Sequence, residues 1–342
     1  MVTARTITPY AAMVVIQLAY GGSNILIKIA LEKGLNQIVF IVYRHLVAVL
    51  VFGPMAYAFE RNKRPPLSFA NVLNIFLLAS LGTTIHLNLY YVGLNYTSAT
   101  VASALGSVIP ALTFLLAVLL RMEKVMIRSV NSQMKVIGAV ICIGGALTFT
   151  FWKGRYLFDG MTKTPLINIQ YAKMSHQRDW IKGSALIITS NAAWSAWLIL
   201  QAVICKIYPA QLSLNALICL FGSVQSCIVA VIFNRQPATW KLGWDLNLLT
   251  IIYCGTLNSG LVYYLQMWVI SEKGPVFAAM FSPLLLVVVG IFSAIAFAEG
   301  LHIGSLVGAV FIIIGLYCVL WGKKKDDQVK EEPWSRESCV HL

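Results

Sequence analysis

The chain has 342 residues, of which 58% are hydrophobic and only 11% are charged, and its mean hydropathy is +0.76. Soluble domains carry about 25% charged residues, so this composition excludes a soluble protein and indicates one that crosses a membrane many times. The net charge of +13 does not indicate nucleic-acid binding, because the basic residues lie in short gaps between apolar segments, as in membrane loops.

Ten apolar segments are long enough to cross about 30 Å of hydrocarbon, which takes about 20 helical residues. They cover residues 9–30, 37–59, 69–92, 98–120, 134–152, 181–204, 211–233, 246–270, 275–298 and 303–321. Most connections are short, so consecutive helices should be antiparallel neighbours in one bundle. The exceptions are a polar loop at 153–179 and a charged tail at 323–342, which we expect to be disordered.

Lysine and arginine in the connections predict how the bundle lies in the membrane. If the N-terminus is cytosolic, most of these residues fall in cytosolic connections, although the 153–179 loop on the outer side is also basic. We therefore expect both termini in the cytosol.

The two halves of the chain repeat each other. "LNIFLLASLGTTIHLNLYY" (Leu73–Tyr91) matches "LNLLTIIYCGTLNSGLVYY" (Leu246–Tyr264), and "VIGAVICIGGA" (Val136–Ala146) matches "LVGAVFIIIGL" (Leu306–Leu316) at nearly the same offset along the chain. Residues 1–152 and 180–322 each hold five predicted helices, an odd number, so the second repeat must enter the membrane inverted. Inverted repeats are typical of transporters whose substrate site lies between the repeats near the midplane.

Four segments resemble a known family: "AYGGSNILIKIAL", "FIVYRHLVAVLVFGPMAYAFERNKRPPLS", "SVIPALTFLLAVLLRMEKV" and "GPVFAAMFSPLLLVVVGIFSAIAFAE". They look like the plant nodulin-like EamA transporters of the drug/metabolite transporter superfamily, which include the UMAMIT amino-acid facilitators and the walls-are-thin type auxin transporter. The similarity extends from Pro9 to Trp321. It implies an all-α membrane protein of ten transmembrane helices, built as two inverted five-helix EamA repeats, that carries amino acids or related organic acids.

Two cations lie where hydrocarbon is expected, and an ionisable residue at the bilayer centre costs about 2.5–3.5 kcal/mol on insertion scales. Arg44 lies about seven residues, or about 11 Å, inside the second helix. It must meet a substrate anion, a polar cavity or backbone carbonyls freed at a helix break. Lys28 is nearer a helix end, where it either faces the same cavity or snorkels to the interface.

Asn24 and Lys28 share one helix face, and the offset of the first repeated segment makes Trp197 and Gln201 their counterparts in the second half. This pattern predicts a substrate cavity with a cation and an amide on one wall and an indole and an amide on the other. The alternative is that Trp197 is a packing residue.

Polar stripes on the third and eighth helices add candidates for the same cavity. We expect Asn88, Tyr91, Asn258 and Gln266 to line it, although such groups also hydrogen-bond between helices. Pro110 and Pro283 should kink the fourth and ninth helices and could serve two gates, or they could bend the helices without motion.

No Asp or Glu lies deep in a predicted span, so we expect facilitated transport down a gradient, with proton coupling through His86 as the alternative. No catalytic or metal motif is present, which indicates no enzyme, cofactor or metal. The predicted function is an amino-acid facilitator or exporter that works by alternating access. The alternatives are an auxin-like aromatic-acid carrier, a non-transporting scaffold and a channel.

The predicted membrane is the plasma membrane, with the vacuolar membrane as the alternative. The predicted partners are a small-molecule substrate, membrane lipid and a second copy in a homodimer, and no nucleic acid.

Overall fold

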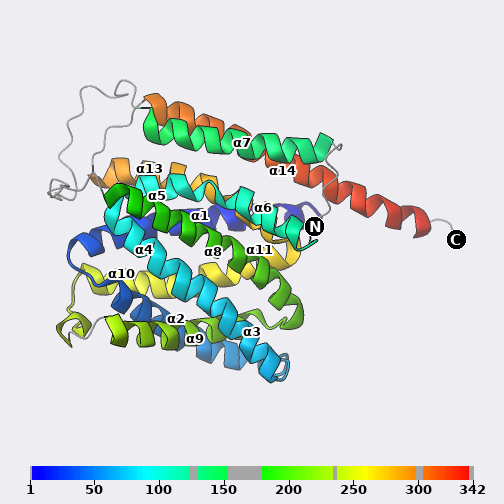
Figure 1. Ribbon diagram of the computed structural model, residues 1–342. Helices are drawn as coiled ribbons and strands as arrows, with labels where there is room; N and C mark the ends of the chain where they lie inside the picture. Colours follow the sequence, from blue (N-terminus) through cyan, green and yellow to red (C-terminus); the bar gives the residue numbers. More distant parts are fainter. Residues whose placement is uncertain (1, 123–129, 153–178, 234–236, 298–302, 339–342) are drawn as a thin grey trace.

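The computed structural model describes residues 2–122, 130–152, 179–233, 237–297 and 303–338 (Figure 1). Over these residues it is all-helical, and ten segments are long and apolar enough to cross a membrane. They are Ile7–Glu32, Gln37–Glu60, Phe69–Tyr96, Ala99–Leu119, Ser132–Phe151, Ile181–Ile207, Gln211–Phe233, Leu246–Lys273, Pro275–Ile295 and Ile303–Gly322. The prediction of ten spans in two inverted five-helix repeats is confirmed.

Some spans consist of one helical element and others of two or three. In the first half these are α1 (Val2–Glu32), α2 (Gln37–Glu60), α3 (Phe69–Ala79), η1 (Ser80–Ile85), α4 (His86–Tyr96), α5 (Ala99–Gly106), α6 (Ile109–Leu119) and α7 (Val130–Phe151). In the second half they are α8 (Asp179–Ile207), α9 (Gln211–Phe233), η2 (Pro237–Trp240), α10 (Leu246–Tyr253), η3 (Cys254–Val262), α11 (Tyr263–Lys273), α12 (Pro275–Met280), α13 (Ser282–Phe297) and α14 (Ile303–Ser338).

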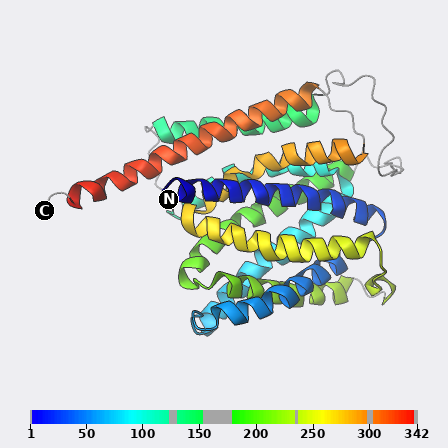
Figure 2. The same ribbon diagram turned by 180° about the vertical axis from the view of Figure 1, so that it is seen from behind.

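The helices run side by side, and both ends of the chain lie at the same end of the bundle (Figures 1 and 2). We expected residues 323–342 to be disordered, but α14 continues as one helix to Ser338 and extends beyond the bundle (Figure 2). Lys, Glu and Gln are good helix formers, and extending an existing helix needs no new nucleus. The predicted loop at 153–179 lies outside the described residues except for its last position.

The third and eighth spans are each interrupted by a π-helical turn at matching places in the repeat. Gly82 lies in η1 and its counterpart Gly255 lies in η3. A Cβ on Gly82 would overlap the indole of Trp197, and a Cβ on Gly255 would lie 2.8 Å from the carbonyl oxygen of Arg44. Each glycine therefore lets a neighbouring helix pack directly against the π-turn.

The fourth and ninth spans are broken just before their prolines. The break between α5 and α6 precedes Pro110, and the break between α12 and α13 at Phe281 precedes Pro283. Each proline lies in the first turn of the second piece, where its missing N–H would have had no partner within the helix. A role in gating stays a prediction.

The last helices of the two halves, α7 and α14, pack against each other through glycines. A Cβ on Gly138 would lie 2.6 Å from the carbonyl oxygen of Gly315, and one on Gly315 would lie 2.6 Å from that of Gly138. Gly145 and Gly308 approach in the same reciprocal way, at 2.9 and 2.7 Å. Such close backbone contact is a common way for membrane helices to associate without a hydrophobic driving force.

Candidate functional site

A central cavity of about 100 Å³ lies between helices of both halves. Its walls come from α1, α2, α4, α5 and the start of α6 in the first half and from α8, η3, α11, α12 and α13 in the second. Its polar and aromatic lining residues are Gln17, Tyr20, Ser23, Asn24, Arg44, His86, Tyr90, Tyr91, Ser103, Asn191, Trp194, Asn258, Tyr263, Gln266 and Ser282. The site is therefore a shared interface between the repeats, as the inverted duplication predicts.

Arg44 is placed in the cavity wall by the way α2 begins. Asn36 caps α2, and its Oδ1 accepts hydrogen bonds from the backbone N–H groups of Ile38 and Val39 at 3.0 and 3.3 Å. The helix then carries Arg44 two turns inward, where its side chain is 2% exposed. The capped helix thus holds a cation inside a membrane-spanning segment, where charged side chains are rare.

The partners of Arg44 come from both halves. Its Nε donates to Ser259 Oγ at 2.6 Å, and its Nη1 donates to Tyr91 Oη at 2.5 Å. The guanidinium carbon lies 5.8 Å from the ring centroid of Tyr263, within the range of a cation–π interaction. Arg44 therefore joins α2 to α4 and to the η3–α11 segment.

No carboxylate among the described residues neutralises Arg44, and no Asp or Glu is found in the described lining of the cavity. Hydroxyls and a ring face satisfy donors but do not cancel a full charge. A buried charge without a counter-ion is costly. The cavity is therefore suited to an anionic group brought by a ligand.

The π-turn η3 supplies a further polar part of the cavity wall. Asn215 of α9 donates through Nδ2 to the carbonyl oxygens of Ser259 and Gly260 at 3.1 and 3.0 Å, which stabilises backbone oxygens within this turn. Asn258, in the same turn, is 1% exposed, and its Oδ1 has no partner within the described part of the chain. The wall thus offers an unused hydrogen-bond acceptor.

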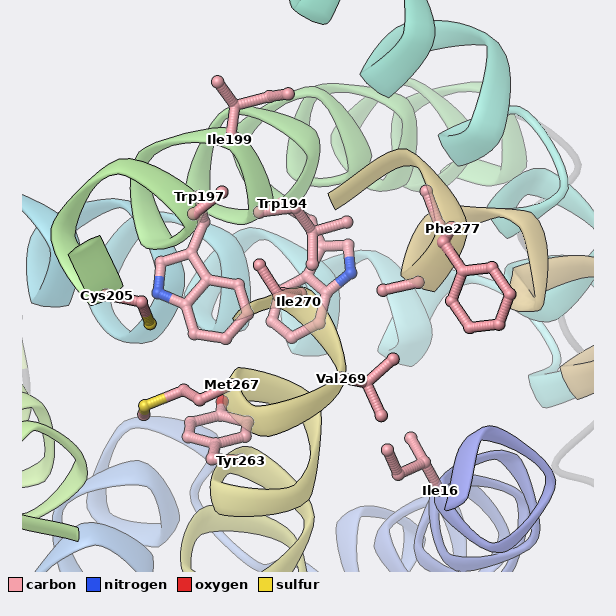
Figure 3. Close-up of a cluster of buried hydrophobic side chains, with 14 of the residues drawn as sticks. Ile16, Trp194, Trp197, Ile199, Cys205, Tyr263, Met267, Val269, Ile270 and Phe277 are labelled. Atoms are coloured by element: carbon pink, nitrogen blue, oxygen red, sulfur yellow. The ribbon is translucent and has the colours of Figure 1, made fainter. Parts of the chain in front are cut away.

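Trp194, Trp197 and Tyr263 lie close together (Figure 3), and Trp194 and Tyr263 belong to the cavity lining. The indole of Trp194 stacks on that of Trp197, with centroids 4.4 Å apart and planes 19° apart, and Trp197 in turn packs against Tyr263 at 5.4 Å. Trp194 lines the cavity, whereas Trp197 lies behind it, fully buried against Gly82. We predicted Trp197 on the cavity wall, but it lies outside the cavity lining, and the indole that lines the cavity is that of Trp194, one helical turn earlier.

Five of the predicted substrate-binding residues meet at the cavity: Asn24, Arg44, Tyr91, Asn258 and Gln266. Gln266 Oε1 accepts a hydrogen bond from Tyr20 Oη at 3.0 Å, which ties α11 to α1. Contact of any of these five with a substrate stays a prediction.

The other predicted residues lie outside the cavity lining in this structure. Lys28 donates through Nζ to the carbonyl oxygens of Leu94 and Thr97, both at 3.0 Å, and pairs with Glu32 at 3.6 Å. It therefore fastens the end of α4 to α1, which is neither of the two roles weighed from the sequence.

Asn88 and Gln201 also lie outside the cavity lining. Asn88 Nδ2 donates to the carbonyl oxygen of Thr84 on its own helical segment at 2.7 Å. Gln201 is fully buried, and neither its Oε1 nor its Nε2 has a partner in the described structure.

The polar and aromatic lining residues that were not among the predicted site residues include Gln17, Tyr20, His86 and Asn191. A sequence signal existed for the first two, because they continue the Asn24 stripe of α1 toward its start at helical spacing. Asn191 lies one turn before Trp194 on α8, where its Nδ2 donates to the carbonyl oxygen of Leu105 at 3.0 Å. His86 was considered as a titratable group but not placed at the site.

Comparisons with known proteins agree with this architecture. The model of the EamA-like transporter family matches residues 8–151 and 181–321, one match in each half. The Arabidopsis thaliana protein named WAT1-related protein At5g64700 is 40% identical over 332 residues, covering 94% of this chain and 91% of its own length. WAT1-related protein At1g43650, also from Arabidopsis thaliana, is 41% identical over 319 residues, covering 93% of this chain and 92% of its own length.

A solved crystal structure also resembles this fold. It superposes with a TM-score of 0.62 at 15% sequence identity and covers 90% of this chain and 98% of its own. At this identity the likeness concerns the fold alone.

Proposed function

Because the chain belongs to the EamA-like transporter family, we propose that it carries amino acids across a membrane by alternating access, as a facilitator or exporter. Membership of this family makes it a membrane transporter and not an enzyme. The amino-acid substrate, the direction and the membrane are our proposals.

One observation carries the choice of substrate class, namely the buried Arg44 without a carboxylate partner among the described residues. Its donors and the Tyr91 hydroxyl can hold a carboxylate in the water-poor centre of the bundle, where such charge-assisted hydrogen bonds are strong. The Oδ1 of Asn258, which has no partner among the described residues, can accept hydrogen bonds from an ammonium group. An amino-acid zwitterion satisfies both sets of groups and adds no net charge.

The arrangement of the repeats supports alternating access. The cavity lies at the repeat interface, and helix breaks occur at matching places before Pro110 and Pro283. Breaks in equivalent helices give each half a place to bend, so that the cavity can open at either end in turn.

Facilitated transport fits the described lining, which carries no carboxylate to act as a proton or cation relay. We place the protein in the plasma membrane with both termini in the cytosol, with the vacuolar membrane as the alternative. A homodimer stays a prediction.

The alternative substrate is an auxin-like aromatic acid. Trp194 packs closely against both Trp197 and His86, at 4.4 and 4.6 Å between ring centroids, and presents an aromatic wall to the cavity. An aryl acetate would place its carboxylate at Arg44 and its ring against this wall, but it would bring no ammonium group into the cavity.

The test is counterflow in proteoliposomes loaded with unlabelled glutamine or unlabelled indole-3-acetate and challenged with the labelled compound. We expect saturable glutamine exchange, and in Arg44→Gln a loss of apparent affinity between about 10- and 100-fold, since hydrogen bonds to a charged group contribute about 1.5–3 kcal/mol. Arg61→Gln, which removes an exposed arginine at the end of α2, is the matched control and should leave exchange unchanged.

Arg44→Lys keeps the positive charge and is the conservative variant. Thermal unfolding of every variant shows whether a loss of exchange comes from a folding defect. Exchange of indole-3-acetate alone would establish the alternative. Exchange of neither compound by folded protein would contradict the proposal.

A further inference from the structure

The position of the ring proton on His86 is set by Ser190 of α8. Nδ1 of His86 lies 3.0 Å from the carbonyl oxygen of Ser190 and 2.7 Å from its Oγ, and this hydroxyl donates to the carbonyl oxygen of His86 at 2.9 Å. A carbonyl oxygen can only accept, so Nδ1 must carry the hydrogen. The neutral ring then has its lone pair on Nε2.

Within the described part of the chain, the lone pair on Nε2 accepts no hydrogen bond. None of the hydrogen bonds formed within the described residues involves this nitrogen, and His86 belongs to the lining of the cavity. The ring packs against Trp194 in a tilted arrangement, with centroids 4.6 Å apart and planes 34° apart. Arg44 already places one full positive charge in the same lining, so a second cation that brings no anion with it is costly there and the neutral ring is favoured.

A second unused acceptor belongs to the same lining but to the other half of the chain. Asn258 Oδ1 is buried without a partner among the described residues, whereas the comparable oxygen of Gln266 already accepts from Tyr20. The cavity therefore combines a cation satisfied only by neutral groups with two acceptors that lack donors. A ligand with an anionic group and a strong donor complements both.

We propose that His86, with its tautomer fixed by Ser190, accepts a hydrogen bond from the substrate's ammonium group and so selects substrates that carry an amine. Asn258 Oδ1 is the second acceptor for the same group. This inference rests on the proposed amino-acid carrier and adds the residues that reject an amine-free acid. A site built to hydrogen-bond a group discriminates strongly against an analogue that lacks it, because its buried acceptors are then left unpaired.

The test compares pairs of compounds that differ only in the amine: glutamine with glutaramate, and phenylalanine with 3-phenylpropionate. Each competes for counterflow of the labelled amino acid in wild type, His86→Asn, His86→Gln and Ser190→Ala. Asparagine can keep a donor near Nδ1 and loses the acceptor at Nε2, whereas glutamine can return an acceptor close to Nε2. The wild type should prefer the amine-bearing member at least about tenfold.

In His86→Asn this preference should fall toward one, through weaker binding of the amino acid with the amine-free acid unchanged. His86→Gln should retain more of the preference, and Ser190→Ala should lie between wild type and His86→Asn. An equal loss for both members of a pair would show that His86 merely ties α4 to α8 and would overturn the inference.

A wild-type protein that exchanges glutamine and glutaramate equally well would also overturn the inference, while the carrier itself would stand. Exchange of no compound in either pair by folded protein would remove the proposed function and this inference together.

Discussion

Lys28 and Gln201 occupy matching places in the two repeats, yet their surroundings are opposite. Lys28 donates to two carbonyl oxygens at the end of α4 and pairs with Glu32. Gln201 is fully buried, with both amide atoms unpartnered in the described structure, and the Nε1 of neighbouring Trp197 is equally without a partner. The two matching positions therefore differ in how well their polar groups are satisfied within the described residues: Lys28 has acceptors and an ion-pair partner, whereas Gln201 is buried without either.

Such a difference between matching positions can make a duplicated chain favour one conformation over another. Buried polar groups without partners cost about 1–3 kcal/mol each, so the Gln201 side of the bundle is the less well satisfied. A conformation that supplies partners to Gln201 at the expense of Lys28 would exchange the roles of the two ends. Three substitutions test this comparison, in decreasing order of expected effect.

Gln201→Lys places a copy of the Lys28 side chain in the other repeat. In the present conformation no described acceptor satisfies position 201, so the buried ammonium should destabilise the fold by about 3–5 kcal/mol, the cost of an uncompensated buried charge. Thermal unfolding in detergent measures this loss. Unchanged stability would mean that the new lysine reaches carbonyl oxygens as Lys28 does, and that the two ends are more alike than they look.

Lys28→Met removes the ammonium group at the matching position while keeping a chain of similar length. We expect a loss of about 1–3 kcal/mol, because two hydrogen bonds from a charged group are lost and the carbonyl oxygens of Leu94 and Thr97 lose that donor. Lys33→Met, at an exposed position in the following turn, is the control and should be neutral. A stability equal to wild type for Lys28→Met would show that these contacts contribute nothing.

Gln201→Leu is the smallest change and has the opposite sign. Replacing a buried, unpartnered amide by an apolar side chain of similar size should raise the unfolding free energy by about 1 kcal/mol. The same variant should slow counterflow if the amide gains a partner in the other state. A clear loss of stability instead would reveal that the amide is already satisfied, for example by bound water.

Much of the architecture could be predicted from the sequence, because its signals are additive over long segments. About 20 apolar residues suffice to identify each span, and the repeated "LN…YY" pattern reveals the duplication. The π-turns were not predicted, since one extra residue in a turn leaves the apolar composition unchanged. The helical conformation of the tail up to Ser338 was not predicted either, because its charge pattern is compatible both with disorder and with a continuation of α14.

The site was only partly predictable for a different reason. Arg44 stands out because a charge inside an apolar segment is visible in one dimension. Trp194 and Trp197 lie one turn apart on the same face, so only tertiary packing against Gly82 decides which one reaches the cavity. The sequence likewise indicates that Lys28 faces inward. Whether its ammonium group reaches the cavity or the end of α4 depends on where α4 ends, which the sequence pattern does not fix.

The reciprocal glycine contacts of α7 and α14 bear on the origin of the protein. Gly138 and Gly308 are repeat counterparts, as are Gly145 and Gly315, and the structure pairs Gly138 with Gly315 and Gly145 with Gly308. A surface that binds its own duplicate in this crossed manner is the isologous interface of a two-fold homodimer. A five-helix ancestor with that surface would assemble as antiparallel pairs only if its gene product inserted in both orientations. In a single chain the two halves are held in opposite orientations, so this requirement does not arise and each half can carry its own side chains.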